Sequence, residues 1–342
     1  MPGNPPDTAT TPNPLRPTRR RMLTILGATL AVPAGALALR GLGGAPEPVR
    51  WDGEVLGAAA AMTLWHPRPE VARQTIQRMR LEIERLEQVF SLYRADSEIT
   101  RLNRDGRLDR PSDDLVGLME LALAFAETSG GAFDPAVQPL WTLHAAHFAR
   151  AGADPEGPPA AEVARALALA DYRGIEADRR GIAFARPGMA VTLNAVAQGH
   201  ITDRIADLLR QEGFGQAMVE LGETRAIGHA PGGGPFRVAL MNPADPGLAD
   251  REVALQDAAL SVSGGYGMRW PGGTSHHIFD PATGHSANRL LDAAVIAPRA
   301  RDADALSTAI FVAGEAAAPA LLRQVPGASA LLTRMDGSRL SL

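Results

Sequence analysis

Residues 302–314, with the sequence DADALSTAIFVAG, carry the strongest single signal in this chain. The run is mostly apolar and predicts a buried helix near the C-terminus. Asp304 and Thr308 stand four residues apart in it, so a helix places their side-chain oxygens on one face. Because the start of a helix favours anions, Asp304 could belong to the N-terminal cap region. The alternative is that the two residues form half of a metal site.

Further helices are predicted where apolar residues recur every three to four positions. In residues 70–92 the apolar side chains alternate with charged ones, as on a helix with one buried face. Ser112 is a typical N-cap, and Gly130 with Gly131 ends the helix that it begins. The predicted helices, besides the one near the C-terminus, cover residues 70–92, 112–130, 163–172 and 197–214.

Short strand-like runs dominate the last third of the chain. The predicted strands cover residues 55–65, 217–221, 236–243, 253–263, 276–280 and 292–298. A closing pair, residues 329–335 and 338–342, is joined by Asp336-Gly337, which is typical of a tight hairpin turn. The mixture predicts an α+β fold with largely antiparallel sheets and packed helices, because the strands do not alternate regularly with helices.

Composition excludes several classes of function. The 342 residues have a net charge of -4, so no polybasic surface for nucleic acid is expected. Cysteine is absent, which excludes disulfides, thiolate metal sites and thiol nucleophiles. The chain also has no G-x-S-x-G, Rossmann or P-loop signature, and His276-His277 lacks the spacing of a helical zinc motif. Any metal must therefore be held by oxygen or imidazole.

The N-terminus resembles an export signal. Arg19, Arg20 and Arg21 precede a moderately apolar run, residues 22–39, and small residues follow it. This order fits the twin-arginine type, so we expect the twin-arginine translocase to carry the protein to the periplasm. An uncleaved membrane anchor is the alternative, because the run approaches the length that spans a bilayer. The predicted organisation is a signal peptide and linker over residues 1–45 and one domain over residues 46–342.

Several motifs together resemble the ApbE-type FAD:protein FMN transferases. The matching motifs, in family order, are FSLYRADSEITRLN (90–103), GGAFDPAVQPLW (130–141), AVAQGHITDRIADLL (195–209), VELGE (219–223), SVSGGY (261–266), HIFDPATG (277–284) and DADALSTAIFVAG (302–314). The resemblance implies an enzyme that cleaves FAD, releases AMP and attaches FMN to a Thr or Ser of a partner protein. The sequence LNAVAQGHITDR (193–204) and the N-terminal leader are most similar to the NosX branch of the family. This similarity implies that the acceptor is a membrane protein of nitrous oxide reduction.

The resemblance also implies the site residues. It makes Asp304, Thr308 and the backbone carbonyl of Ala195 the ligands of Mg²⁺, a hard cation that prefers oxygen and bridges phosphates. Asp304 is thereby a catalytic residue. The FAD-binding residues that it implies are Tyr93, Ala132, Phe133, Asp134, Thr192, Gln198 and Ile278. The ring of Tyr93, just past a predicted helix, suits stacking on a base or flavin.

His277 aligns with the histidine of the family's H-x-x-D-P-x-T-G motif. It is expected either to accept the proton of the attacking hydroxyl, with a titration near pH 6 to 7, or to contact a phosphate. Two departures stand out, because many members carry Lys or Glu at the position of Gln198 and Thr at that of Val262. An amide can still hydrogen-bond the flavin edge. The alternative function is a periplasmic FAD-binding carrier without transferase activity.

Overall fold

The computed structural model describes residues 47–272 and 275–342. The predicted leader, and the linker up to residue 45, lie outside these residues. The strands are β1 (Pro48–Val55), β2 (Ala58–Trp65), β3 (Arg107–Asp109), β4 (Ile175–Asp178), β5 (Gly181–Phe184), β6 (Ala217–Glu220), β7 (Thr224–Ile227), β8 (Phe236–Asn242), β9 (Asp245–Leu255), β10 (Ala259–Gly264), β11 (Leu290–Ala297), β12 (Ser329–Arg334) and β13 (Arg339–Ser341). The α-helices are α2 (Pro69–Phe90), α3 (Glu98–Asp105), α4 (Asp113–Thr128), α5 (Gln138–Phe148), α6 (Ala160–Leu167), α7 (Asn194–Gln211), α8 (Ala300–Ala313) and α9 (Ala318–Leu322). Three short 3-10 helices join them, η1 (Pro135–Val137), η2 (Tyr172–Gly174) and η3 (Gly265–Gly267).

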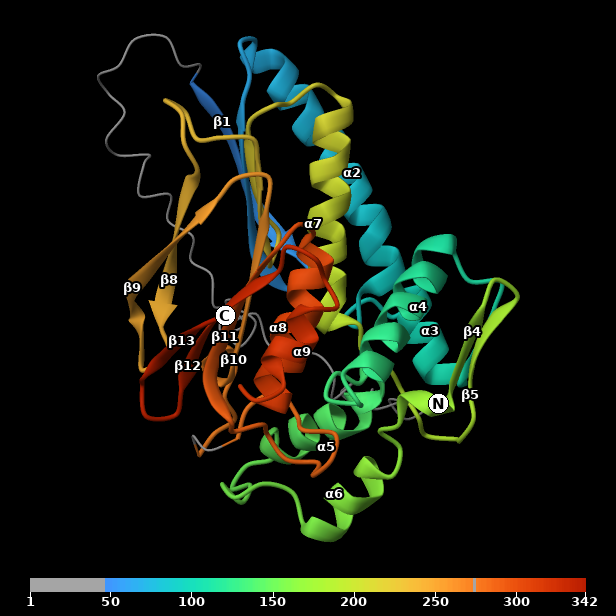
Figure 1. The fold of residues 1–342 in the computed structure, drawn as a ribbon. Coiled ribbons are helices and arrows are strands. Elements are labelled where there is room, and N and C mark those ends of the chain that lie inside the picture. The colour runs from blue at the N-terminus through green and yellow to red at the C-terminus, as the bar shows by residue number, and fades with distance from the viewer. Residues whose placement is uncertain (1–46, 273–274) are drawn as a thin grey trace, which may run out of the picture.

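One large sheet organises the molecule. Its eight strands run in the order β1-β2-β6-β7-β10-β11-β12-β13, and each neighbouring pair is antiparallel. Helices α2, α7 and α8 lie along one face of this sheet (Figure 1). The β8–β9 hairpin lies along the other face. A small sheet, β3-β5-β4, stands apart beyond α3 and α4.

Strand periodicity divides the core between the two faces of the sheet. In β6, Ala217 and Val219 point into the core shared with the helices, while Met218 between them packs under the β8–β9 hairpin. Successive side chains of a strand point to opposite faces, so a strand covered on both sides is apolar at every position. Among the helices of the described residues, none combines the length and the apolar composition that a membrane crossing requires.

The long helices form where the sequence predicts them. The predicted helix over residues 70–92 is α2, and its buried positions include Ile76, Met79, Ile83 and Leu86. The Ser112 hydroxyl accepts a hydrogen bond of 3.2 Å from the Leu115 N–H, so the predicted N-cap of α4 is confirmed. The predicted closing hairpin is β12–β13, and Gly337 adopts φ 82° in its turn.

Three predicted strands differ from the structure. Residues 55–65 were expected as one strand, but Leu56 and Gly57 have positive φ and turn the chain between β1 and β2. The expected strand over 253–263 is broken at Asp257, which has φ 49° and sends β9 and β10 into different sheets. The expected strand over 276–280 makes only isolated bridges at His276 and Phe279. Apolar alternation does not reveal such turns when the turning residue is not glycine.

The expected helix over residues 163–172 also differs, because α6 covers residues 160–167 and Tyr172 begins η2. The Asp171 side chain accepts from the Arg173 N–H and caps this separate turn. Helices α3 and α5 and the small sheet were not predicted. Their segments are short, and their apolar residues give no clear period by themselves.

Candidate functional site

Helices α7 and α8 pack closely, and the predicted metal ligands lie where the two helices meet. The Gly199 N–H of α7 donates a hydrogen bond of 3.1 Å to Asp304 Oδ2 of α8. A Cβ at Gly199 would stand 2.5 Å from the carbonyl oxygen of Ala300, so only glycine permits this approach. Ala195 lies one turn before Gly199, and Thr308 lies one turn after Asp304. The predicted ligands therefore come from neighbouring turns of two touching helices.

Asp304 is not the cap of its helix. Helix α8 begins at Ala300, after the N-cap residue Arg299, so Asp304 lies in the second turn and is buried. Its carboxylate instead accepts from a different helix. The cap-region hypothesis is therefore wrong, and the metal hypothesis stays a prediction.

Hydroxyl groups surround the side of α8 that carries Thr308. The Ser263 hydroxyl lies 3.1 Å from that of Thr308 and 2.8 Å from that of Ser307. Ser261 lies 3.0 Å from Ser307, whose hydroxyl donates to the Asp304 carbonyl at 2.9 Å. Thr308 is thus oriented from β10 by Ser263, a residue of the SVSGGY motif.

Glu223 is a buried carboxyl group that the sequence analysis missed. One of its oxygens, Oε2, is buried with no hydrogen-bond partner among the described residues. Burial raises the pKa of Glu223 well above its usual range, and the negative charge of Asp304 adds to the effect. Burial also raises the pKa of Asp304 to about 8. In the sequence, Glu223 is marked only as the last residue of the VELGE motif, to which no site role was assigned.

These groups fit a magnesium ion by the chemistry of their atoms. Within residues 47–272 and 275–342, no three His, Asp or Glu side chains gather closely enough to hold a metal by themselves. The predicted set does not need such a cluster, because it consists of one carboxylate, one hydroxyl and one backbone carbonyl, all oxygens. Two neighbouring buried carboxyl groups, Asp304 and Glu223, form no ion pair with a cationic side chain of the described residues, and a divalent cation would supply the positive charge.

A pocket of about 420 Å³ opens next to this face of α8. Val312, one turn beyond Thr308, lines it together with Ala132 and Asp134 of the predicted FAD set. The Asp134 carboxylate accepts from the N–H groups of Ala136 at 2.7 Å and Tyr172 at 3.1 Å, which shapes the wall of the pocket. Burial raises the pKa of Asp134 to about 6.

The other predicted FAD residues are spread around this region. Phe133 is buried against Phe125, so it supports the pocket wall from the core. The Thr192 N–H donates to the Pro135 carbonyl at 2.8 Å. This hydrogen bond joins the segment just before α7 to the turn that contains Asp134. The Gln198 side chain packs on Gly222. A Cβ added to Gly222 would lie 2.4 Å from the Nε2 of Gln198. Ile278 is half-buried and follows His277.

The two adjacent histidines have different surroundings. His276 is buried, and its Nε2 lies 2.8 Å from the Ala287 carbonyl, so the ring donates there and has a structural role. The Nδ1 of His277 lies 3.2 Å from the Met268 carbonyl. Since a carbonyl only accepts, Nδ1 carries the proton and Nε2 keeps the lone pair of a neutral ring. Burial lowers the pKa of His277 below the usual value of 6.5, which favours this neutral form.

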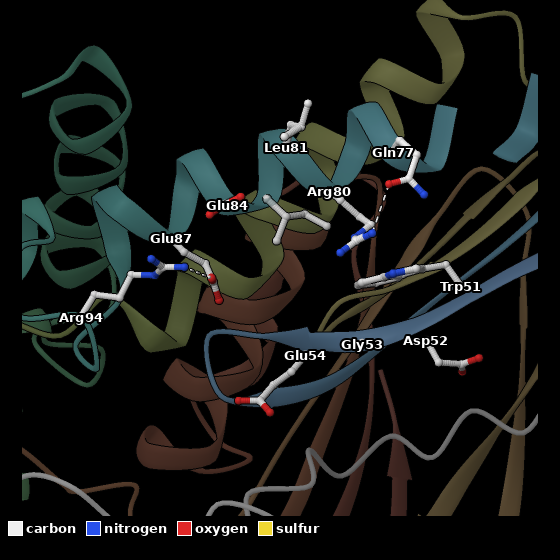
Figure 2. A pocket seen from close by; sticks show the side chains of 11 residues that line it. Trp51, Asp52, Gly53, Glu54, Gln77, Arg80, Leu81, Glu84, Glu87 and Arg94 are labelled. Carbon is white, nitrogen blue, oxygen red and sulfur yellow. Dashed lines mark hydrogen bonds and ion pairs between the residues drawn. The ribbon is translucent and has the colours of Figure 1, made fainter. Parts of the chain in front are cut away.

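Tyr93 lies at a different part of the surface. Its ring is 38% exposed and packs beside Gly57 in the β1–β2 turn. The next residue, Arg94, lines a second pocket of about 490 Å³ between β1 and α2, where Trp51, Arg80 and Leu81 also lie (Figure 2). This pocket is larger, but none of the predicted site residues lines it. The structure confirms that the Tyr93 ring is accessible, and its role stays a prediction.

Comparison with known proteins identifies the family. The model of the ApbE family matches residues 56–332. The chain belongs to the ApbE family. An FAD:protein FMN transferase of Treponema pallidum is 32% identical over 315 residues, which cover 82% of this chain and 83% of the relative. These values place the α7–α8 contact and the 420 Å³ pocket well inside the region shared with the ApbE family.

Solved ApbE structures share the fold. The flavin transferase ApbE from Vibrio cholerae superposes with a TM-score of 0.75 at 25% identity and covers 87% of this chain and 97% of its own. The ApbE protein from Thermotoga maritima gives a TM-score of 0.74 at 25% identity, with 86% and 97% covered. The predicted α+β, ApbE-like fold is thereby confirmed.

Proposed function

We propose that this protein is an FAD:protein FMN transferase that uses Mg²⁺ and releases AMP. The observation that carries the proposal is the position of Thr308 and Asp304 on α8, one turn and two turns before Val312, which lines the same pocket as Ala132 and Asp134. Membership of the ApbE family and relatives that bear this activity as their name support the same function.

The residues Asp304 and Thr308, with the carbonyl of Ala195, would hold Mg²⁺. When bound, a magnesium ion neutralises the charge of the FAD pyrophosphate during phosphoryl transfer. The chain's own contribution is orientation: the Gly199 N–H fixes one oxygen of Asp304, and Ser263 holds the Thr308 hydroxyl. Asp304 is buried, and Thr308 is half-buried.

His277 is the proposed proton acceptor. Its Nδ1–H is engaged with the Met268 carbonyl, which leaves the lone pair on Nε2. The acceptor protein's hydroxyl oxygen forms a bond to the FMN phosphorus, its proton passes to Nε2, and the bond to the AMP oxygen breaks with its electron pair. FMN then remains on the partner as a phosphoester.

Export and the identity of the acceptor are also proposals. The leader with Arg19 to Arg21 supports transport by the twin-arginine translocase to the periplasm. The resemblance to the NosX branch supports an acceptor among the membrane proteins of nitrous oxide reduction. Genes for nitrous oxide reductase beside the gene of this chain would agree with that acceptor, and their absence would argue against it.

The test is a reaction of the purified protein with FAD, Mg²⁺ and the candidate acceptor. We expect AMP in the solution and a mass gain of one FMN on the acceptor, both absent when EDTA is added. The specific alternative, an FAD carrier, predicts that FAD binds while no AMP appears. AMP without a labelled acceptor would support FAD cleavage and reject this acceptor.

A further inference from the structure

Helix α8 has no capping side chain of its own. Its N-cap residue, Arg299, offers no acceptor to the first free N–H groups. These groups are instead bonded by a carboxylate from α7: Asp203 Oδ1 accepts from the Ala300 N–H at 2.8 Å and Oδ2 from the Arg301 N–H at 3.1 Å. A carboxylate at this end of a helix is favoured by both the free N–H groups and the helix dipole. One residue of α7 thus fixes the beginning of α8.

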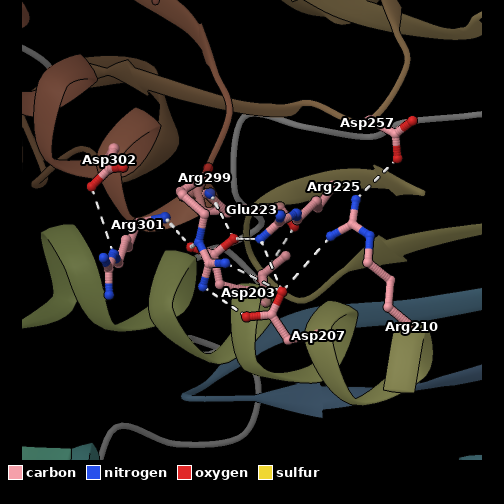
Figure 3. Close-up of polar contacts among 11 residues, drawn as sticks. Asp203, Asp207, Arg210, Glu223, Arg225, Asp257, Arg299, Arg301 and Asp302 are labelled. Atoms are coloured by element: carbon pink, nitrogen blue, oxygen red, sulfur yellow. Dashed lines mark hydrogen bonds and ion pairs between the residues drawn. The ribbon is translucent and has the colours of Figure 1, made fainter. Parts of the chain in front are cut away.

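Arginines hold Asp203 in place from other elements. Asp203 is 1% exposed and pairs with Arg225 of β7, which is 4% exposed. The Nε of Arg299 lies 3.3 Å from Asp203 Oδ2. In Figure 3 these side chains converge between α7, β7 and the start of α8. A buried carboxylate with partners on several sides has little freedom to move.

Two contacts, one turn apart on α7, set the position of α8. Gly199 touches the backbone of Ala300 and donates to Asp304, and Asp203 bonds the first N–H groups of α8. A small slide or rotation of α8 would break all of these bonds together. Because Thr308 lies on the same rigid helix as Asp304, its hydroxyl would move with it.

We propose that Asp203 is a positioning residue for magnesium: it holds α8 at the register on α7 that brings Asp304 and Thr308 into binding geometry. It acts through the helix, since its oxygens are already bonded to N–H groups of α8 and to arginine. This inference rests on the magnesium site in the proposed function. Groups that orient metal ligands commonly change metal affinity by about 10- to 100-fold when they are removed.

Asp207 provides a matched control. It lies one turn further along α7, pairs with Arg299 at 2.8 Å and with Arg210 at 3.7 Å, and is 32% exposed. Its carboxylate accepts hydrogen bonds from the Arg299 guanidinium, whereas the first N–H groups of α8 donate to Asp203. Asp207→Asn therefore removes one charge from the same network and leaves the start of α8 capped.

The experiment measures binding of Mn²⁺ alone, as a spectroscopic substitute for Mg²⁺, to the full chain by electron paramagnetic resonance. We expect Asp203→Asn to weaken Mn²⁺ binding about 10-fold or more and Asp207→Asn to change it less than about twofold. In the transfer assay, Asp203→Asn should raise the Mg²⁺ concentration for half-maximal AMP release by a similar factor. Turnover at saturating Mg²⁺ should fall less than about threefold, because α8 retains its other contacts.

A second variant guards against unfolding, because the loss of its close partner Asp203 leaves the buried Arg225 paired only with Asp207, at 3.9 Å, among the described residues, and so destabilises the protein. Asp203→Asn/Arg225→Gln removes both charges and should show the same loss of Mn²⁺ affinity in protein that is folded by circular dichroism. Unchanged affinity in a folded Asp203 variant would overturn the positioning role and leave the proposed function standing. Absence of Mn²⁺ binding in the unaltered chain would instead reject the magnesium site itself, and this inference with it.

Discussion

At the scale of single residues, the site combines groups that are buried without full compensation. Asp304 has one hydrogen bond from Gly199, and Glu223 has a buried oxygen without a partner among the described residues. Such groups cost free energy in an empty protein, and sites that bind charged ligands are where proteins retain them. The aligned sequence motifs identified Asp304. Glu223 became visible only through its surroundings.

Asp304→Asn tests the carboxylate as a metal ligand. Since burial raises the pKa of Asp304 to about 8, the carboxyl group is largely uncharged at pH 7 unless a cation binds it, and asparagine should be tolerated. We expect FMN transfer to fall by at least about 100-fold while the melting temperature changes by only a few degrees. Asp302→Asn, on the same helix, is the control and should keep its activity. An early-melting Asp304→Asn would assign a structural role.

Substitutions of Tyr93 test whether its aromatic ring contacts FAD. Because the ring is 38% exposed, its removal should cost little stability. We expect Tyr93→Ala to weaken FAD binding by about 1 kcal/mol, the scale of one aromatic contact, and Tyr93→Phe to bind almost normally. Titration of FAD with each purified variant measures this. An equal loss in both would show that the hydroxyl and not stacking makes the interaction.

His277 is tested by its pH dependence. Burial lowers its pKa below 6.5, so the ring becomes neutral, and able to accept a proton, at a lower pH than a free histidine. AMP release should therefore rise with pH, with a midpoint below 6.5 rather than at the 6 to 7 expected from the sequence. His277→Ala should lower turnover by about 100- to 10,000-fold and keep FAD affinity. A joint loss of affinity and rate, with a flat pH profile, would indicate a phosphate contact.

At the scale of elements, the distance between α7 and α8 depends on one missing side chain. Gly199 lets the two backbones meet, although glycine inside a helix lowers the stability of the helix itself. The sequence pattern predicted helix α7. The close packing of α7 against α8 explains why a glycine stands at position 199. The same pair of helices carries the ligands that the family resemblance implies.

Gly199→Ala and Gly117→Ala form a matched pair of helix substitutions. A Cβ at Gly117 of α4 meets nothing within 4 Å, so alanine should stabilise the protein by about 0.5 to 1 kcal/mol. At Gly199 the new methyl group would meet the Ala300 carbonyl, and we expect a loss of about 1 to 3 kcal/mol. Urea unfolding measures both, and only Gly199→Ala should also reduce AMP release. Equal stabilisation by both would mean that the helices are not tightly packed there.

At the scale of the whole molecule, an eight-stranded sheet and the helices on one of its faces form the scaffold of the described residues. The proposal of export rests on the sequence of residues 1–45 alone, so it can be tested separately from the activity.

Replacement of Arg19, Arg20 and Arg21 by Lys tests the export signal. The twin-arginine translocase recognises arginine itself and not just positive charge, so we expect the protein to stay in the cytoplasm. Arg16→Lys, in the same basic segment but outside the triplet, should leave export unchanged. Cell fractionation followed by detection of the protein measures both. Unchanged periplasmic yield of the triple variant would favour a different export pathway.

The sequence by itself determined the α+β class and the long amphipathic helices, because these depend on local periodicity. It also determined the family, because the family is recognised by short, characteristic sequence motifs. The family and the fold are confirmed. The turn at Asp257 escaped prediction because a non-glycine residue with positive φ leaves no mark in the sequence pattern, and the turn at Leu56-Gly57 escaped because one glycine in an apolar run was read as part of a strand. Three features were decided only by the tertiary structure: the capping of α8 by Asp203, the exclusion of a cap role for Asp304, and the burial of Glu223 beside Asp304. Each depends on which side chain meets another element far along the chain, and burial and hydrogen bonding are properties of that contact and not of either segment alone.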